Sequence, residues 1–312
     1  MALILREKKF PSASGLGDCR CRMWVPDEVR GAVQITHGMA EHIDRYDHFA
    51  RYLADSGFLV YGMDLISHGG SRKEGEPLGF FGEDQGWDHL IADIGTLRKM
   101  VQADYPSTPF VMLGHSMGSF LVRSYAARTG GGFQGYILSG TAGGSWRYRF
   151  GRWLAGREIK KGRGKEPAEK LNNMMIGGYT KRFSAPRTTH DWLSRDTDLV
   201  DLYVDDPLCG FPFTAYGMRD LFDGLLEISN KRWAQRMPKR PTLLLSGAKD
   251  PVGGSGKGVL QVERWLRSTG HKVACKLYPY SRHEILNEIN KQETYEDILL
   301  FLEIIAIDGE RA

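Results

Sequence analysis

Three features are scarce in this chain of 312 residues: cysteine, long apolar runs and an excess of one charge. Its four cysteines are too few for a disulfide scaffold of this length, and the C-x-C pair has no second pair to complete a metal site. No apolar run reaches the roughly 20 residues that a membrane-spanning helix needs. The start, MALILREKKF, is too short and wrongly ordered for a secretory signal. The cysteines are Cys19, Cys21, Cys209 and Cys275.

The charge balance bears on partners and location. With 42 basic and 38 acidic residues the net charge is +4, which is too small to indicate a nucleic-acid partner, and no nucleic-acid-reading module is recognisable. We therefore expect reduced thiols, a cytoplasmic location and no nucleic-acid partner, with peripheral contact to the inner membrane face left open. The sequence does not indicate an oligomeric state.

What the chain does contain is an alternation of short β-rich runs with amphipathic segments of helix length. This alternation is typical of βα units on a mainly parallel sheet. We expect a helix over residues 85–106 and a closing helix over 294–307. Eight strands are predicted, at residues 2–5, 19–25, 31–36, 58–63, 110–115, 135–140, 241–247 and 272–278.

The alternation stops after residue 140 and resumes near residue 240. Between these points the chain has no convincing buried strand, many aromatic residues and methionines, and several Gly/Pro breaks. We interpret residues 141–235 as a mostly helical cap over the sheet, and residues 1–140 and 236–312 as the sheet-bearing core.

One short motif, Gly114-His115-Ser116-Met117-Gly118, stands between a buried-type run, PFVML, and the helix-suited segment SFLVRSYAART. Strand, tight turn and helix are what a nucleophile elbow requires, and small residues must flank so sharp a turn. Taken alone, the motif is weak, because an ordinary βα turn with Ser116 capping the helix has the same letters.

A serine hydroxyl needs a histidine to take its proton and an acid to orient that histidine. In this fold class the order along the chain is serine, acid, histidine, each after a later strand. His283 follows the strand predicted at 272–278, whereas His271 lies at the wrong end of it. Asp250 follows the strand predicted at 241–247. Ser116, Asp250 and His283 therefore form the predicted catalytic triad.

Backbone amides must also stabilise the oxyanion of the tetrahedral intermediate. The amide of Met117 directly follows the serine, and the amide of Met39 lies in the loop after an early strand, where Gly38 permits close approach. We expect neither metal nor cofactor. The spacing of His42, Asp44, Asp47 and His48 matches no common metal site, and GGSGKG at 253–258 lacks the spacing of a nucleotide-binding loop.

Five motifs in order resemble the monoacylglycerol lipase and lysophospholipase group of α/β-hydrolases. The resemblance covers roughly residues 30–140 and 240–305, and implies an α/β-hydrolase fold with the roles already given to Ser116, Asp250, His283, Met39 and Met117. One departure is Ser67, where the group usually has glycine. The motifs are HGMAEH, DLISHGGS, GHSMG, SGAKDPVG and YSRHEILNE.

The cap contains two features that bear on the substrate. Residues 145–165 hold eight Lys/Arg and one Glu among aromatic residues, a pattern that fits either an anionic lipid surface or a solvated helix face whose aromatics pack inward. Apolar cap residues would suit an acyl pocket or the cap's own core. The candidates for substrate contact are Phe150, Trp153, Met174, Met175, Phe183, Trp192 and Phe211.

These observations favour a cofactor-free serine hydrolase that cleaves carboxylic esters of medium or long acyl chain, with a monoacylglycerol or lysophospholipid as substrate. A small-ester carboxylesterase on the same triad is an alternative. An amidase or peptidase is another, because acidic residues at 196–206 offer anchors for a substrate amine. A non-catalytic binding protein is disfavoured because all three triad residues are present.

Overall fold

The computed structural model describes residues 3–310, and their side chains as far as residue 307. Its strands form one eight-stranded sheet in the order β1-β2-β4-β3-β5-β6-β7-β8. Strands β3 to β8 run parallel, whereas β2 is antiparallel to both β1 and β4. The strands are β1 (Ile4–Pro11), β2 (Asp18–Val25), β3 (Gly31–Thr36), β4 (Phe58–Met63), β5 (Phe110–His115), β6 (Gly135–Ser139), β7 (Thr242–Gly247) and β8 (Val273–Tyr278).

The predicted eight-stranded, mostly parallel sheet is thus confirmed. One strand prediction needs correction: the strand predicted at 2–5 runs over Ile4–Pro11, and Ala2 lies outside the described residues. The sequence pattern that marks a strand is weak in β1, because β1 is an edge strand that pairs only with β2. Most of its side chains are exposed, so charged residues occupy positions where a buried strand would have hydrophobic ones.

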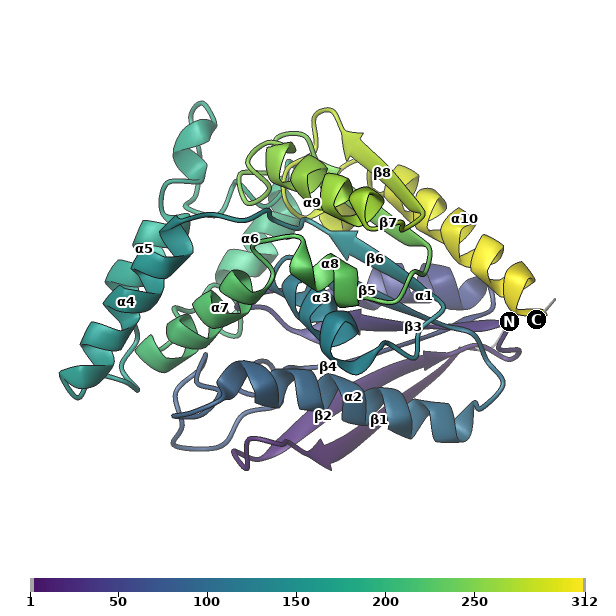
Figure 1. Ribbon diagram of the computed structural model, residues 1–312, viewed down its shortest axis with the longest axis horizontal. Coiled ribbons are helices and arrows are strands. Elements are labelled where there is room, and N and C mark those ends of the chain that lie inside the picture. The colour runs from purple at the N-terminus through teal and green to yellow at the C-terminus, as the bar shows by residue number, and fades with distance from the viewer. Residues whose placement is uncertain (1–2, 311–312) are drawn as a thin grey trace.

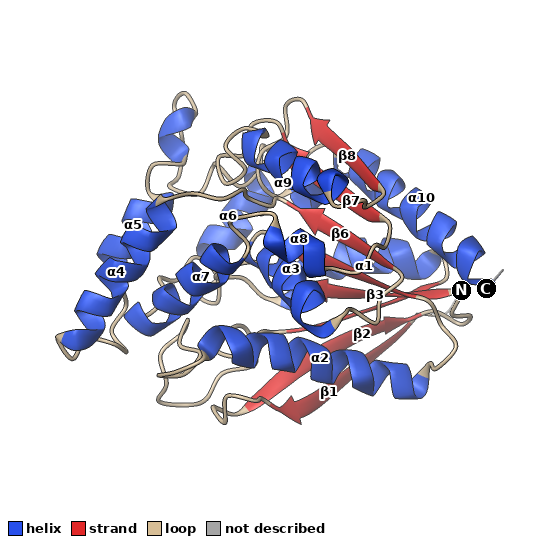
Figure 2. Ribbon diagram, viewed as in Figure 1, coloured by secondary structure: helices blue, strands red, loops and turns tan. Residues whose placement is uncertain are grey.

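Helices cover both faces of the sheet, as Figures 1 and 2 show. Residues of α2, α3, α8 and α9 contribute to one apolar cluster on one face, and residues of α1 and α10 to a second cluster on the other. Strands β3 to β7 are buried along their whole length between these layers. The bounds are α1 (Asp47–Asp55), α2 (Gly86–Asp104), α3 (Met117–Thr129), α8 (Arg232–Arg236), α9 (Lys257–Ser268) and α10 (Lys291–Glu310).

The remaining long helices lie between β6 and β7 and project from one end of the sheet (Figure 1). Helix α4 packs against α7 and α5. Helix α8 crosses the predicted boundary at residue 235, and it packs against α3 and α9 of the core. These helices are α4 (Arg147–Lys160), α5 (Glu169–Ile176), α6 (Thr197–Asp205) and α7 (Ala215–Glu227).

None of the helices in the described part of the chain combines the length and the apolar character that crossing a bilayer requires.

Candidate active site

Ser116 occupies a sharp turn between β5 and α3, with φ of 50° and ψ of −120°. A non-glycine residue rarely adopts positive φ, and here the turn lifts the side chain above the strand end. Gly118 is required by close packing, because a Cβ there would lie 1.9 Å from the carbonyl oxygen of Thr36. The Ser116 side chain makes no capping hydrogen bond to α3, so the helix-capping alternative is wrong.

The predicted acid and base meet beside this turn. His283 Nδ1 lies 2.9 Å from Asp250 Oδ2, and the side chains of both residues are almost completely buried. The ring N–H is not aligned closely enough with this oxygen to make a regular hydrogen bond, although the pair lies in ion-pair range. The amide of Val252 donates to Asp250 Oδ1 at 2.8 Å, which holds the carboxylate toward the histidine.

The surroundings of His283 set its charge. Burial by itself would lower the pKa of the imidazole, but the carboxylate of Asp250, with Glu284 and Glu41 behind it, raises the pKa above its ordinary value. The neighbouring ring of His115 lies 4.7 Å from that of His283. Burial, reinforced by His283, lowers the pKa of His115 to about 4, so His115 is neutral near pH 7.

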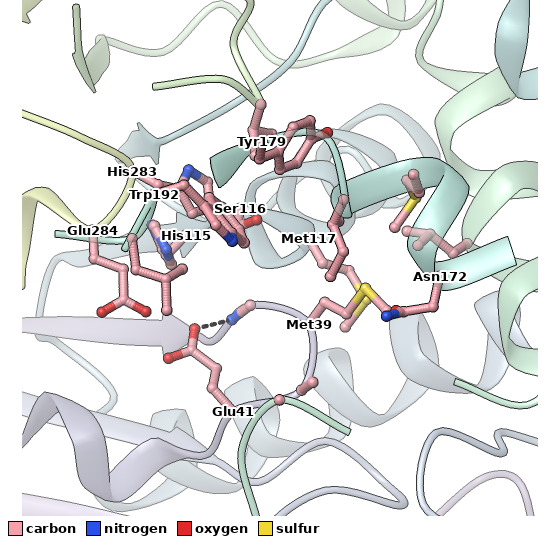
Figure 3. A pocket seen from close by; sticks show the side chains of 18 of the residues that line it. Met39, Glu41, His115, Ser116, Met117, Asn172, Tyr179, Trp192, His283 and Glu284 are labelled. Carbon is pink, nitrogen blue, oxygen red and sulfur yellow. Dashed lines mark hydrogen bonds between the residues drawn. The ribbon is translucent and has the colours of Figure 1, made fainter. Parts of the chain in front are cut away.

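Ser116 and His283 line the same cavity, together with residues of the segment between β6 and β7 such as Asn172 and Tyr179 (Figure 3). Met39 and Met117 line it too, so the two residues whose amides are the predicted oxyanion donors flank the serine. Met117 is the first residue of α3, where the amides of the first turn have no carbonyl partner within the helix. The structure therefore brings the predicted nucleophile, the predicted base and the residues of the predicted oxyanion donors to one cavity.

Three of the seven predicted substrate-contact residues line this cavity: Met175, Trp192 and Phe211. The other four are corrected. Phe150 and Trp153 of α4 and Met174 of α5 do not line the cavity and are about half exposed, whereas Tyr148 of α4, which was not predicted, does line it. Phe183 packs beside the Trp192 cluster instead, under the guanidinium of Arg282.

A buried ionic network lies directly behind the site, and the sequence analysis missed it. Arg45 donates to Glu41 Oε2 at 2.7 Å and makes a bidentate pair with Glu284, at 2.7 and 2.6 Å. Glu41 Oε1 accepts from the amide of Gly38 at 2.5 Å and from the hydroxyl of Tyr46 at 2.9 Å. Figure 3 shows Glu41 and Glu284 on the same side of the cavity as His115.

This network joins two loops that the chemistry uses. Gly38 precedes Met39 in the predicted oxyanion loop, and Glu284 directly follows His283, so one guanidinium fixes both backbones. Burial opposes ionisation of both carboxylates, but Arg45 outweighs it; the pKa of Glu284 falls to about 2 and that of Glu41 is also lowered. A sequence signal existed: Glu284 adjoins the candidate base, and Glu41 and Arg45 have helical i,i+4 spacing.

The acidic residues set aside as metal ligands have other partners. Asp44 pairs with Arg20 and Arg22, and Asp47 pairs with Arg51 and accepts from the indole of Trp24. These carboxylates therefore hold strand β2 to the segment that follows the predicted oxyanion loop.

A strained serine, a buried His–Asp pair at the ends of later strands and a cap over a parallel sheet together define an α/β-hydrolase. The chain belongs to the hydrolase family described as "Serine aminopeptidase, S33", whose model matches residues 27–290.

Relatives with known names agree with this membership. A monoacylglycerol lipase of Mycolicibacterium smegmatis is 30% identical over 299 residues, covering 92% of this chain and 94% of the relative. A monoglyceride lipase of Rattus norvegicus is 30% identical over 272 residues, covering 86% and 80%. The solved structure of a thermostable carboxyl esterase from Bacillus coagulans superposes with a TM-score of 0.92 at 34% identity, covering 98% of this chain and 100% of that one. The chain is a carboxylic ester hydrolase that is similar to monoacylglycerol lipases.

Proposed function

We propose that this protein hydrolyses glycerol-type monoesters of medium or long acyl chain, such as a monoacylglycerol or a lysophospholipid, through an acyl-enzyme on Ser116. The observation that carries the proposal is a largely apolar cavity into which Ser116 and His283 open together. An acyl chain suits this lining, and the named lipases and esterase among the relatives support an ester as the scissile group.

In the proposed reaction His283, oriented by Asp250, takes the proton of Ser116 as Oγ attacks the ester carbonyl. The amides of Met39 and Met117 donate to the oxyanion that forms. The imidazolium then gives its proton to the departing alcohol, which leaves the acyl group on Ser116. His283 next deprotonates a water molecule that attacks this acyl-enzyme, and the released serine regains its proton.

Of the predicted cap, residues 141–231 are proposed as the cap, with α5 and the segments around α6 and α7 closing the acyl pocket. Asn172, Met175, Tyr203 and Leu225 line the cavity from these segments. Helix α8 is assigned to the core, because it packs against α3 and α9.

The ester proposal is tested with a panel of monoacylglycerols, lysophospholipids, short aryl esters and aminoacyl amides. Ser116→Ala is expected to abolish ester turnover and labelling by a fluorophosphonate probe, because no other group replaces the nucleophile. Ser107→Ala, at an exposed serine outside the cavity, is the matched control and keeps both. Undiminished turnover by Ser116→Ala defeats the mechanism, and preference for aminoacyl amides defeats the ester assignment.

The family description includes an aminopeptidase, but the cavity offers little to hold a substrate amine. Asp196 caps α6, Asp201 pairs with Arg187, and neither lines the cavity. The carboxylates that do line it, Glu41 and Glu284, already pair with Arg45. These contacts favour an ester substrate over a peptide with a free amino terminus.

We also propose that the outer face of α4 contacts an anionic membrane, at the cytoplasmic side of the cell. Trp146 is 76% exposed, and Phe150 and Trp153, each about half exposed, stack on each other with 5.8 Å between their ring centroids. Arg147 and Arg157 lie over these indoles, and for both of them no carboxylate of the described residues is within ion-pair distance. Exposed aromatics flanked by free cations suit a lipid headgroup boundary.

Replacing Trp146 and Trp153 together by serine is expected to weaken binding to phosphatidylglycerol-rich vesicles at least tenfold in a sedimentation assay, because both indoles leave the interface. Tyr280→Ser is the matched control, since Tyr280 is 72% exposed on a loop elsewhere in the chain. Equal vesicle binding by wild type and the double variant would contradict membrane contact and would indicate that this face of α4 is only solvated.

A further inference from the structure

Three side chains with different ligand atoms converge at the junction of the cap and the oxyanion loop. His42 follows this loop, whereas Asp206 and Cys209 lie in the cap segment after α6. One nitrogen, one carboxylate oxygen and one sulfur from these residues lie within 4.8 Å of one another. All three residues are partly buried, so the group is sheltered but reachable from solvent.

The three donor atoms, and the hydrogen bond that orients Asp206, suit a divalent cation of intermediate softness such as zinc. Imidazole nitrogen, thiolate sulfur and carboxylate oxygen are the donors that zinc takes in proteins, and three of them leave a fourth position for water. Asp206 is already oriented: its Oδ1 accepts from the amide of Leu208 at 2.8 Å, which leaves Oδ2 facing His42 Nε2, also at 2.8 Å. Such outer hydrogen bonds are what hold metal-binding carboxylates in place.

The surrounding charge is compatible with a cation. Arg45 is a positive group that acts on Cys209, but it is paired with both Glu41 and Glu284. Burial raises the pKa of the Cys209 thiol, so without a metal the sulfur stays protonated at neutral pH. A bound cation would deprotonate it, as metal-coordinated thiols are deprotonated.

We propose that His42, Asp206 and Cys209 form a zinc site that links the proposed cap to the predicted oxyanion loop. On binding, Cys209 loses its proton to solvent, the imidazole carries its remaining proton on Nδ1, and Nε2, Oδ2 and Sγ each give an electron pair to the ion. The bound ion would add to two hydrogen bonds that already join the same segments. The carbonyl oxygen of Ala40 accepts from the amide of Gly210 at 2.9 Å and from the hydroxyl of Tyr203 at 3.1 Å.

The site is tested by calorimetry with Zn²⁺ on the full chain, and by the absorption of Co²⁺, whose thiolate charge-transfer band reports a sulfur ligand directly. Wild type is expected to bind one ion per chain, to rise in Tm with zinc concentration, and to bind roughly tenfold more tightly per pH unit near neutrality because one proton leaves. Cys209→Ser should bind at least tenfold more weakly and lose the cobalt–thiolate band.

Cys275→Ser is the matched control, because Cys275 is a partly buried free thiol on β8, outside this group. It should bind zinc as the wild type does. Asp206→Asn supplies a second variant if Cys209→Ser does not fold. Absence of stoichiometric zinc binding by the wild type overturns the proposal, as does equal binding by wild type and both ligand variants. Neither result bears on ester hydrolysis by Ser116.

Discussion

At the scale of single residues, the proposed reaction depends on the protonation state of the His283 imidazole. It must be neutral to accept the serine proton, and its pKa is raised by Asp250 against the opposing effect of burial. Activity is therefore expected to fall as the pH drops through a value above the ordinary histidine pKa of about 6.5.

Asp250→Asn tests this assignment. Without the carboxylate, burial dominates, so the acid limb of the kcat/KM profile should move to lower pH, while kcat falls by about 10³- to 10⁴-fold because the imidazole loses its orientation. The profile is measured with an activated aryl ester to keep the slow variant within reach. An acid limb that stays in place would assign it to another group.

Glu41 is predicted to be a positioning residue. Glu41→Gln leaves a buried guanidinium partly unpaired and weakens the bond to the Gly38 amide, so we expect kcat to fall at least tenfold with KM less affected. Glu288→Gln is the matched control, because Glu288 is equally buried and pairs with Arg195 outside the cavity. Both variants lose stability by about 3 kcal/mol or more, but only Glu41→Gln should change kcat in folded protein.

At the level of secondary-structure elements, the contact between α3 and β3 determines where Ser116, the proposed nucleophile, lies. Gly118→Ala would place a Cβ against the carbonyl of Thr36, and backbone cannot move aside as a flexible side chain can. We expect little folded protein, or a Tm lowered by more than 10 °C, in thermal denaturation monitored by circular dichroism. That shift corresponds to a loss of about 4 kcal/mol or more.

Gly156→Ala is the control for this prediction. Gly156 lies inside α4 and a Cβ there meets no atom within 4 Å, so alanine should raise stability by about 0.5–1 kcal/mol through reduced backbone entropy. If Gly118→Ala and Gly156→Ala change Tm equally, close packing is not the reason that glycine stands at position 118.

For the molecule as a whole, one buried arginine joins the cap to the core. Arg123 of α3 donates to the carbonyl oxygens of Ala142, where the chain leaves the sheet, and of Ile228, where it returns, at 2.7 and 2.8 Å. The guanidinium also lies 4.3 Å from the ring centroid of Trp233. Both connections of the cap thus converge on the helix that follows Ser116.

Arg123→Met is expected to lower the free energy of unfolding by about 3 kcal/mol or more in urea titrations, because two buried carbonyl groups lose their donor. Arg128→Met on the same helix is the comparison: Arg128 pairs with Glu227 and Asp88 at the surface, where ion pairs contribute about 1 kcal/mol or less. A smaller loss for Arg123→Met than for Arg128→Met would contradict the anchoring role.

Ser67 stands before His68, where the monoacylglycerol lipase and lysophospholipase group usually has glycine, and the structure accommodates this difference. Ser67 adopts positive φ, 67°, as a glycine would, and its hydroxyl donates to the carbonyl oxygen of Pro77 at 2.8 Å. Local hydrogen bonds of the Ser67 hydroxyl thus offset the unfavourable backbone conformation.

By itself, the sequence determined the sheet and the order of its chemical groups. Periodicity and turn residues are local, so strands such as Phe110–His115 could be predicted from neighbouring residues, as could the placement of Ser116, Asp250 and His283 after β5, β7 and β8. The tertiary structure alone decided which side chains of residues 141–235 face the cavity: Phe150 and Trp153 of α4 are exposed, whereas Tyr148 of the same helix lines the cavity. It alone brought Arg45 to Glu284 and His42 to Asp206, since contacts between residues more than 160 positions apart depend on packing that no local pattern encodes.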